Sequence, residues 1–197
     1  MEPELQQYTD TNLCVSVQQE YMSHDNAADL FNYLIKNAKF KHGYYTAKGT
    51  VSKKRNKVVY GSIPAYKAIF RGVEISERVI HWNTQPRLRE LAERLTAHTG
   101  QEYHVCVIQM YNTGEVGIKP HRDKEMKPGT IIASLSLGAE RTMRFEHRSG
   151  KVVDIPLPHG SLCLIHPPTN DVWTHSIPTD ATTTPRLSLI FRNCEGM

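Results

Sequence analysis

The sequence predicts a mainly β protein with flanking helices (α+β), whose core is a jelly roll. After Gly100 the chain consists of short runs of β-branched and apolar residues, separated by Gly, Pro or polar turn residues. Before Gly100, two segments carry apolar residues at helical spacing. The number and spacing of the short runs fit a jelly roll best among all-β architectures.

Two helices are expected, at residues 26–38 and 86–98. In the first, Leu30 and Leu34 begin an apolar stripe with a helical period. The second repeats this pattern and has recognisable ends. Its expected boundary residues are Asn83 or Thr84 as the cap, Pro86 as the first residue and Gly100 after the end.

The expected strands all lie in the second half of the chain, where the sequence alternates or is continuously apolar. A helical, basic front section would pack onto them, with no clear linker between the two. We therefore expect one domain over residues 1–197, with an extension at about 1–100 and a jelly-roll core at about 101–197. The expected strands are 103–111, 130–138, 141–147, 151–157, 160–166 and 186–192.

Composition indicates a folded protein, with 39% hydrophobic and 22% charged residues among 197. No stretch is apolar enough for a membrane span, and the N-terminus has no signal-peptide pattern. The four cysteines form no CxxC pair, which argues against a structural zinc site or a disulfide framework. We expect a reducing, intracellular location in the nucleus or cytoplasm, no membrane partner, and a monomer.

Positive charge is concentrated in the front section. No acidic residue lies between Asp29 and Glu74, whereas ten lysines and arginines do. The rest of the chain carries 14 basic and 20 acidic residues, so this block suggests an anionic partner such as nucleic acid. Aromatic residues interleave with the cations, which favours nucleic acid over a solvated loop. The candidate contacts are Lys53, Lys54 and Arg55.

A candidate metal site begins with His121 and Asp123, which would lie on the same side of an extended segment. Two histidines and one carboxylate form the ligand set of non-haem Fe(II) oxygenases and leave positions for a cosubstrate and O₂. Taken alone, the pair reads more simply as a polar turn with a surface histidine. A third ligand would come from His147, His159, His166 or His175.

The last expected strand places Arg186, Ser188 and Arg192 on one face. Two arginines inside a sandwich are costly unless anions pair with them. They lie about 20 Å apart along the strand, and their long side chains could close around a small dicarboxylate. Gln109 and Tyr111 share a face of another strand and could contribute to the same pocket. The alternative is an edge strand with both arginines in water.

These residues, in this order, resemble the AlkB family of Fe(II)/2-oxoglutarate dioxygenases, and most closely its animal-type nucleic-acid demethylases. The resemblance covers roughly residues 55 to 192 and includes "IASLSLGAERTMRF" and "PLPHGSLCLIHPPTNDVWTHSIP". The ordered motif is Gln109-x-Tyr111, His121-x-Asp123, His175 and Arg186-x5-Arg192.

The resemblance implies a double-stranded β-helix, which is a jelly roll, with an N-terminal nucleotide-recognition lid. It implies His121, Asp123 and His175 as iron ligands. It also implies that Arg186 and Tyr111 bind the distal carboxylate of 2-oxoglutarate and that Arg192 lies near the end that chelates iron. The cosubstrate set departs from the family at two positions: Gln109 and Ser188 stand where the family usually has Asn.

The implied activity is oxidative demethylation of N-alkylated bases, such as 1-methyladenine and 3-methylcytosine, in DNA or RNA. In the family, Fe(II), 2-oxoglutarate and O₂ form an Fe(IV)-oxo species that hydroxylates the alkyl group, with release of formaldehyde and succinate. By the same resemblance, Glu125 would face the base edge, Phe70 would stack on the base, and Tyr60 would lie in the lid. Three alternatives remain: an oxygenase of this fold acting on protein or a small molecule, a non-catalytic nucleic-acid-binding module, and a cupin-type metal protein that uses no 2-oxoglutarate and would not need the paired arginines.

Overall fold

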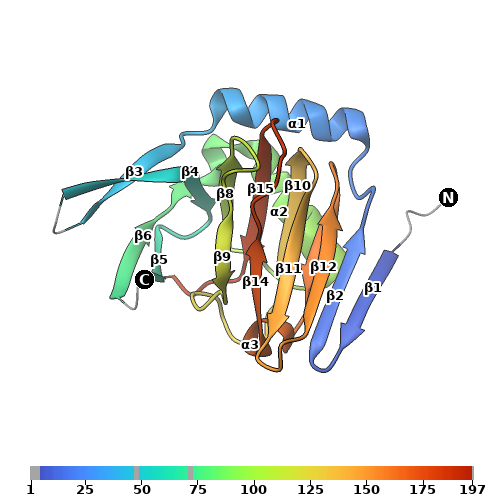
Figure 1. Ribbon diagram of the computed structural model, residues 1–197. Helices are drawn as coiled ribbons and strands as arrows, with labels where there is room; N and C mark the ends of the chain where they lie inside the picture. Colours follow the sequence, from blue (N-terminus) through green and yellow to red (C-terminus); the bar gives the residue numbers. More distant parts are fainter. Residues whose placement is uncertain (1–4, 47–48, 71–72, 197) are drawn as a thin grey trace.

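The computed structural model describes residues 5–46, 49–70 and 73–196, without the side chains of residues 41–55 and 69–74. Two β-sheets lie face to face, and two long helices cover the outer face of the larger sheet (Figure 1). Within the described residues, the larger sheet has nine strands in the order β1-β2-β13-β10-β15-β8-β4-β3, with β7 beside β4. The smaller sheet has the order β12-β11-β14-β9, and β5 pairs with β6. This confirms the predicted jelly roll with flanking helices.

The elements of the front section are β1 (Leu5–Asp10), β2 (Leu13–Gln18), α1 (His24–Asn37), β3 (Lys41–Thr46), β4 (Gly49–Gly61), β5 (Ala65–Phe70), β6 (Val73–Arg78), β7 (Ile80–His81), a 3-10 turn (Trp82–Thr84) and α2 (Pro86–Thr99). Those of the second half are β8 (Val105–Tyr111), β9 (Ile118–His121), β10 (Ile132–Gly138), β11 (Arg141–His147), β12 (Val152–Leu157), β13 (Leu162–Ile165), α3 (Thr169–Val172), β14 (Trp173–Ile177) and β15 (Arg186–Arg192).

Strand β15 separates two apolar cores because its side chains alternate between the faces of the sheet. Leu187, Leu189 and Phe191 pack against α1 and α2 in the helix-side core. Arg186 and Arg192 point to the opposite face, where strands of both sheets form the sandwich core. The exposed-edge alternative is therefore wrong, since β15 lies between β10 and β8 and both arginines are buried.

Both expected helices are confirmed, with small differences at their ends. The cap of α2 is Gln85, so the prediction of Asn83 or Thr84 is wrong; these two residues belong to the preceding 3-10 turn. Gly100 ends α2 at a φ of 71°, and its N–H donates to the Thr96 carbonyl at 2.9 Å. This left-handed conformation is one that glycine adopts at little cost.

The front section contains strands as well as the expected helices. β2 pairs with β13, and the second half of β4 pairs with β8 through residues 56–61. The charged stretch within β4 lacks the apolar alternation that identifies a half-buried strand, so its sequence predicted a basic block rather than a strand. Its pairing depends on the neighbouring strand β8, which no local pattern of β4 reveals.

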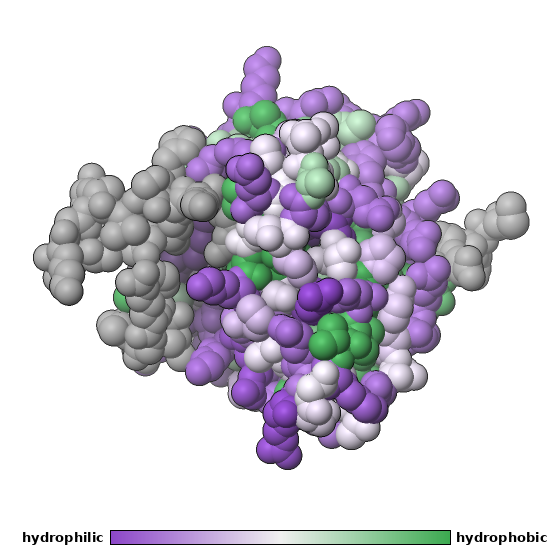
Figure 2. Space-filling model, viewed as in Figure 1, coloured by the Kyte–Doolittle hydropathy of each residue, from purple (hydrophilic) through white to green (hydrophobic). Residues whose placement is uncertain are grey.

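The outer face of the smaller sheet is mostly hydrophilic, with a few separate hydrophobic areas (Figure 2). Arg144 and Asp154 face each other there across β11 and β12 in an exposed bidentate ion pair at 2.7 Å. Among the described residues, no helix combines the length and apolar character needed to cross a membrane.

Trp173→Phe is expected to lower the free energy of unfolding by ~1–3 kcal/mol, because Trp173 is fully buried and its indole N–H donates to the Thr11 carbonyl at 3.0 Å. The smaller ring would leave that partly buried carbonyl without its donor. Urea unfolding measures the effect. The matched control is Trp82→Phe in the helix-side core, whose indole N–H makes no hydrogen bond within the described part of the chain. Equal losses in the two variants would contradict a contribution from the hydrogen bond.

Candidate active site

The smaller sheet brings His121, Asp123 and His175 together. His121 ends β9 and lies directly opposite His175 of β14 in the strand register. Asp123 follows two residues later, and one ligand atom from each residue lies within 4.8 Å of the others. Of the four downstream histidines considered as the third ligand, His175 is therefore the one that joins the pair.

Electrostatics favour the protonation states that bind a cation. Burial alone would raise the pKa of Asp123, but attraction to Arg192, His175 and His121 outweighs it and leaves the pKa below its usual range. Burial lowers the pKa of His175 to about 4, against the opposing attraction of Asp123. At neutral pH the cluster thus offers a carboxylate and a neutral buried imidazole, which are the forms that bind metals.

Asp123 is fixed by two neighbours. Nη2 of Arg192 lies 2.7 Å from Oδ2 of Asp123, and Nη1 of Arg192 donates to Oε1 of Glu125 at 2.7 Å. On the backbone, the Asp123 N–H donates to Oδ1 of Asn170 at 2.9 Å, and Nδ2 of Asn170 donates to the Asp123 carbonyl at 2.7 Å. The oxygen Oδ1 of Asp123 faces Nε2 of His121 at 3.6 Å. One carboxylate oxygen is thus held by arginine while the other faces the histidines.

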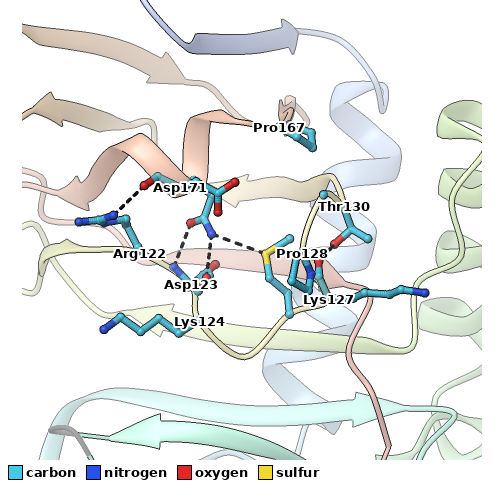
Figure 3. A pocket seen from close by; sticks show the side chains of 11 residues that line it. Arg122, Asp123, Lys124, Lys127, Pro128, Thr130, Pro167 and Asp171 are labelled. Carbon is cyan, nitrogen blue, oxygen red and sulfur yellow. Dashed lines mark hydrogen bonds between the residues drawn. The ribbon is translucent and has the colours of Figure 1, made fainter.

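Figure 3 shows a pocket of ≈ 290 Å³ beside Asp123, lined mainly by the segment 122–130 that follows β9. Basic side chains line it: Arg122, Lys124 and Lys127. Arg122 is held in place there, since its Nη1 donates to the Asp171 carbonyl at 2.7 Å.

The other arginine of β15, Arg186, is buried beside polar side chains. Arg186 is 1% exposed, and its Nη2 donates to Oγ of Ser136 at 3.0 Å. Its Nε and Nη1 are buried and make no hydrogen bond within the described residues. The Tyr111 ring lies beneath the guanidinium group, with its centroid 5.3 Å from Cζ. Buried, incompletely paired guanidinium nitrogens are the donors that a carboxylate ligand satisfies.

A small cavity of ≈ 30 Å³ lies between the two sheets; Tyr111 lines it, whereas Arg186, which packs on the Tyr111 ring, does not. It is lined by the three-residue cluster and Arg192, and by Gln109, Tyr111 and Ser188 from β8 and β15. Tyr111 donates from its hydroxyl to Oε1 of Gln109 at 3.3 Å. The residues fit an iron ion at one end and a carboxylate of a small dicarboxylate at the other. Iron would be held by His121, Asp123 and His175, and the distal carboxylate by Arg186.

The family model described as "2OG-Fe(II) oxygenase superfamily" matches residues 15–194 of the chain. The chain belongs to the 2OG-Fe(II) oxygenase superfamily. By that description, the cofactors of the superfamily are Fe(II) and 2-oxoglutarate, with O₂ as the oxidant implied by the oxygenase activity. They are the cofactors predicted from the sequence.

Curated relatives in this superfamily confirm the resemblance to the AlkB family. The chain is 37% identical over 119 residues to the DNA oxidative demethylase ALKBH2 of Mus musculus, which is 54% of this chain and 50% of that protein. Human ALKBH2 is likewise 37% identical, with 54% and 46% covered. Human alkB homolog 3, an alpha-ketoglutarate-dependent dioxygenase, is 32% identical over 125 residues. The matches thus span about half the length of these relatives.

Solved structures of this superfamily share the fold. The structure of OsALKBH1 superposes with a TM-score of 0.63 at 14% identity and covers 95% of this chain and 100% of its own. A 2OG-Fe(II) oxygenase from Burkholderia pseudomallei superposes with a TM-score of 0.59 at 12% identity and covers 90% and 84%. At these identities the likeness concerns the fold alone.

The residues predicted to contact the base do not lie together in the structure. Glu125 is paired with Arg192, which lines the cavity. Tyr60 is 1% exposed in the helix-side core, and its hydroxyl accepts from the Lys39 N–H at 3.1 Å. The prediction that Tyr60 lies in a lid is therefore wrong, because its ring is enclosed by apolar side chains on the far side of the sheet. The side chains of Phe70, Lys53, Lys54 and Arg55 lie outside the described residues.

The other downstream histidines have structural contacts. His166 shares a 3.0 Å hydrogen bond with the Ser16 hydroxyl. His159 accepts from the Gly138 N–H at 2.8 Å, and His147 packs on the Trp173 ring with centroids 5.0 Å apart. None of the three belongs to the cluster of His121, Asp123 and His175.

Two functional neighbours escaped sequence reasoning, namely Asn170 and Ser136. Asn170 lies 47 residues after Asp123 in sequence, and Ser136 lies 50 residues before Arg186. Each is a common polar residue with no spacing that marks it. Their contacts depend on which strands pair, and that information is absent from a local pattern.

Proposed function

We propose that this chain is an Fe(II)- and 2-oxoglutarate-dependent oxidative demethylase of N-alkylated bases in DNA or RNA, such as 1-methyladenine and 3-methylcytosine. The observation that supports it most directly is the cavity in which the His121–Asp123–His175 cluster meets the polar side chains of β8 and β15. The likeness to proteins named DNA oxidative demethylase supports the choice of substrate class.

One group of residues would bind the iron and another would bind 2-oxoglutarate. His121, Asp123 and His175 hold the iron, which with 2-oxoglutarate and O₂ supplies the oxidation of an alkyl C–H bond. Arg186 and Tyr111 bind the distal carboxylate of 2-oxoglutarate and thereby orient the cosubstrate. Gln109 and Ser188 line the wall between the two ends and offer hydrogen bonds where the family usually has Asn.

Arg192 keeps Asp123 ionised and in place by holding its second carboxylate oxygen. Because the cavity lies between the two β-sheets, a base must leave its stack to reach the iron. Glu125 contacts Arg192, which lines the cavity, and a carboxylate there would favour a cationic methylated base. It faces such a base while it shares Arg192 with Asp123.

The decisive experiment is incubation of the purified chain with Fe(II), 2-oxoglutarate, O₂ and oligonucleotides that contain 1-methyladenine or 3-methylcytosine. Mass spectrometry follows the loss of about 14 Da for each methyl group that is replaced by hydrogen. The expected result is demethylation with matching formation of succinate and formaldehyde. Turnover of 2-oxoglutarate without demethylation of any DNA or RNA substrate would favour an oxygenase acting on protein or a small molecule. Oligonucleotide binding without turnover of either kind would favour a binding module.

Replacement of Lys53, Lys54 and Arg55 by Ala is expected to weaken oligonucleotide binding and to flatten its salt dependence, because fewer counterions are released. The slope of log K against log salt should fall by about 2 for single strands. Fluorescence anisotropy over a salt series measures it. The matched control removes three cations from the β11–β12 hairpin instead: Arg144, Arg148 and Lys151. An equal fall in both triple variants would contradict a specific role of the basic block.

We further propose that residues 1–197 act as a single dioxygenase domain, with about 1–100 as the nucleotide-recognition extension. A monomer in the nucleus or cytoplasm fits this function. All four cysteines are free, which suits a reducing compartment.

A further inference from the structure

Arg141 is a buried cation that lies outside the proposed catalytic cavity. It is 2% exposed and begins β11. Its Nη2 donates to the carbonyls of Pro178 at 2.6 Å, Val116 at 3.2 Å and Gly114 at 3.3 Å. Its Nη1 donates to the carbonyls of Val116 at 3.3 Å and Thr113 at 3.4 Å. Nε lies 2.7 Å from Oδ2 of Asp180. One guanidinium group therefore binds two separate loops.

These loops join the strands that carry the site. Residues 112–117 connect β8, which ends at Tyr111, with β9, which ends at His121. Residues 178–185 connect β14, which holds His175, with β15, which begins at Arg186. Tyr111 and Arg186 lie directly opposite each other in the register, so each is the residue next to a loop that Arg141 holds.

Hydrogen bonds between the loops complete the arrangement. The Gly114 N–H donates to the Thr182 carbonyl at 2.6 Å, and the Asp180 N–H donates to the Gly114 carbonyl at 2.9 Å. A Cβ atom at Gly114 would collide with backbone and side-chain atoms of Asp180. The two loops are therefore packed at backbone distance, and Arg141 with Asp180 closes one side of them.

Arg141 also packs against Tyr111, which lines the cavity. Its Cζ lies 5.7 Å from the centroid of the Tyr111 ring, and Cζ of Arg186 lies 5.3 Å from the same centroid. The ring thus packs against two buried guanidinium groups, which restricts where its hydroxyl can lie. Unlike Arg186, Arg141 has its nitrogens taken by backbone carbonyls and Asp180, so it is placed to hold Tyr111 rather than to bind a ligand.

We propose that Arg141, together with Asp180, is a positioning residue for 2-oxoglutarate: it fixes the two loops next to Tyr111 and Arg186, and so sets the spacing of the groups that receive the distal carboxylate. This inference rests on the proposed function, because it assigns 2-oxoglutarate to the Arg186 end of the cavity. The iron ligands depend on it less, since His121 and His175 are held to each other by the pairing of β9 and β14.

The test measures binding without turnover. Mn(II), which replaces iron, and then 2-oxoglutarate are titrated into the full chain by calorimetry in the absence of O₂. Arg141→Lys keeps the charge but cannot reach all the carbonyls, and it is expected to weaken 2-oxoglutarate binding about 10-fold, as loss of a supporting contact does at other sites. Mn(II) affinity should change less than about 3-fold by the same reasoning. The matched control is Arg144→Lys on the same strand, which breaks the exposed pair with Asp154 and should leave both affinities unchanged.

Asp180→Asn is the second variant, because Asp180 lies at the surface and its change leaves the buried arginine in place. It should weaken 2-oxoglutarate binding in the same direction by a smaller factor. Unchanged 2-oxoglutarate affinity in Arg141→Lys, even with a lower melting temperature, would mean a merely structural role and would overturn the inference. Should Arg141→Lys not fold, unchanged affinity in Asp180→Asn overturns it. A wild-type chain that binds Mn(II) but no 2-oxoglutarate overturns the proposed function, and this inference with it.

Discussion

His121→Ala is expected to abolish demethylation and 2-oxoglutarate turnover, because it removes one of three ligands from the only such cluster in the described residues. Two remaining ligands hold iron weakly, and metal affinity should fall by more than about 100-fold, beyond the loss caused by changing an outer-shell partner. Activity is followed by succinate formation, and metal affinity by titration with Mn(II). The loss should appear in both measurements.

The matched control is His98→Ala, which changes an exposed histidine on α2. It should retain wild-type turnover and metal affinity. Full activity in His121→Ala would show that the metal site has been assigned to the wrong residues. Lost turnover with unchanged metal affinity would show that His121 is needed for catalysis but does not bind the metal.

Arg192→Met is expected to lower the free energy of unfolding of the metal-free protein by ~3–5 kcal/mol, since removal of one partner from a buried ion pair leaves a charge without compensation. Arg192 is 4% exposed and contacts two carboxylates, those of Asp123 and Glu125, at 2.7 Å each. Without the guanidinium group, Asp123 would be a buried anion beside Glu125. Urea unfolding in the presence of a chelator measures the change, because bound metal would replace part of the lost charge.

Arg186→Met is the matched control on the same face of the same strand. Arg186 faces no carboxylate in the described part of the chain; it contacts the Ser136 hydroxyl and the Tyr111 ring. Replacing a buried cation without an anionic partner by an apolar side chain should leave stability within about 1 kcal/mol or raise it. The same change should abolish 2-oxoglutarate binding. Equal destabilisation by both substitutions would contradict the different roles assigned to the two arginines.

The core of the site could be predicted because its chemistry is unusual for its position. Two arginines on one face of an apolar strand predict an anionic partner. Beside such a strand, a histidine and an aspartate two residues apart are better explained as metal ligands than as a polar turn. The fold followed from short runs with a period of two and from the helical stripes. The choice of His175 among four histidines depended on family likeness and not on a local pattern.

What the sequence could not predict depends on strand register. The family resemblance placed Tyr60 in the lid, yet the pleat of β4 turns its ring into the helix-side core. Glu125 seemed free to read a base, yet it shares Arg192 with Asp123 across 67 residues of sequence. Asn170 and Arg141 act through backbone carbonyls, and such contacts place no demand on sequence spacing.

The pairing of β4 with β8 bears on how such proteins diversify. β8 carries Gln109 and Tyr111, and its second edge is covered by residues 56–61 of β4. Without residues 56–61, β8 would have an unpaired edge that can pair with strands of other molecules. We therefore expect this part of β4 to tolerate little change. Sequence variation that changes substrate preference is expected in the first half of β4 and in β3, because these segments do not pair with β8.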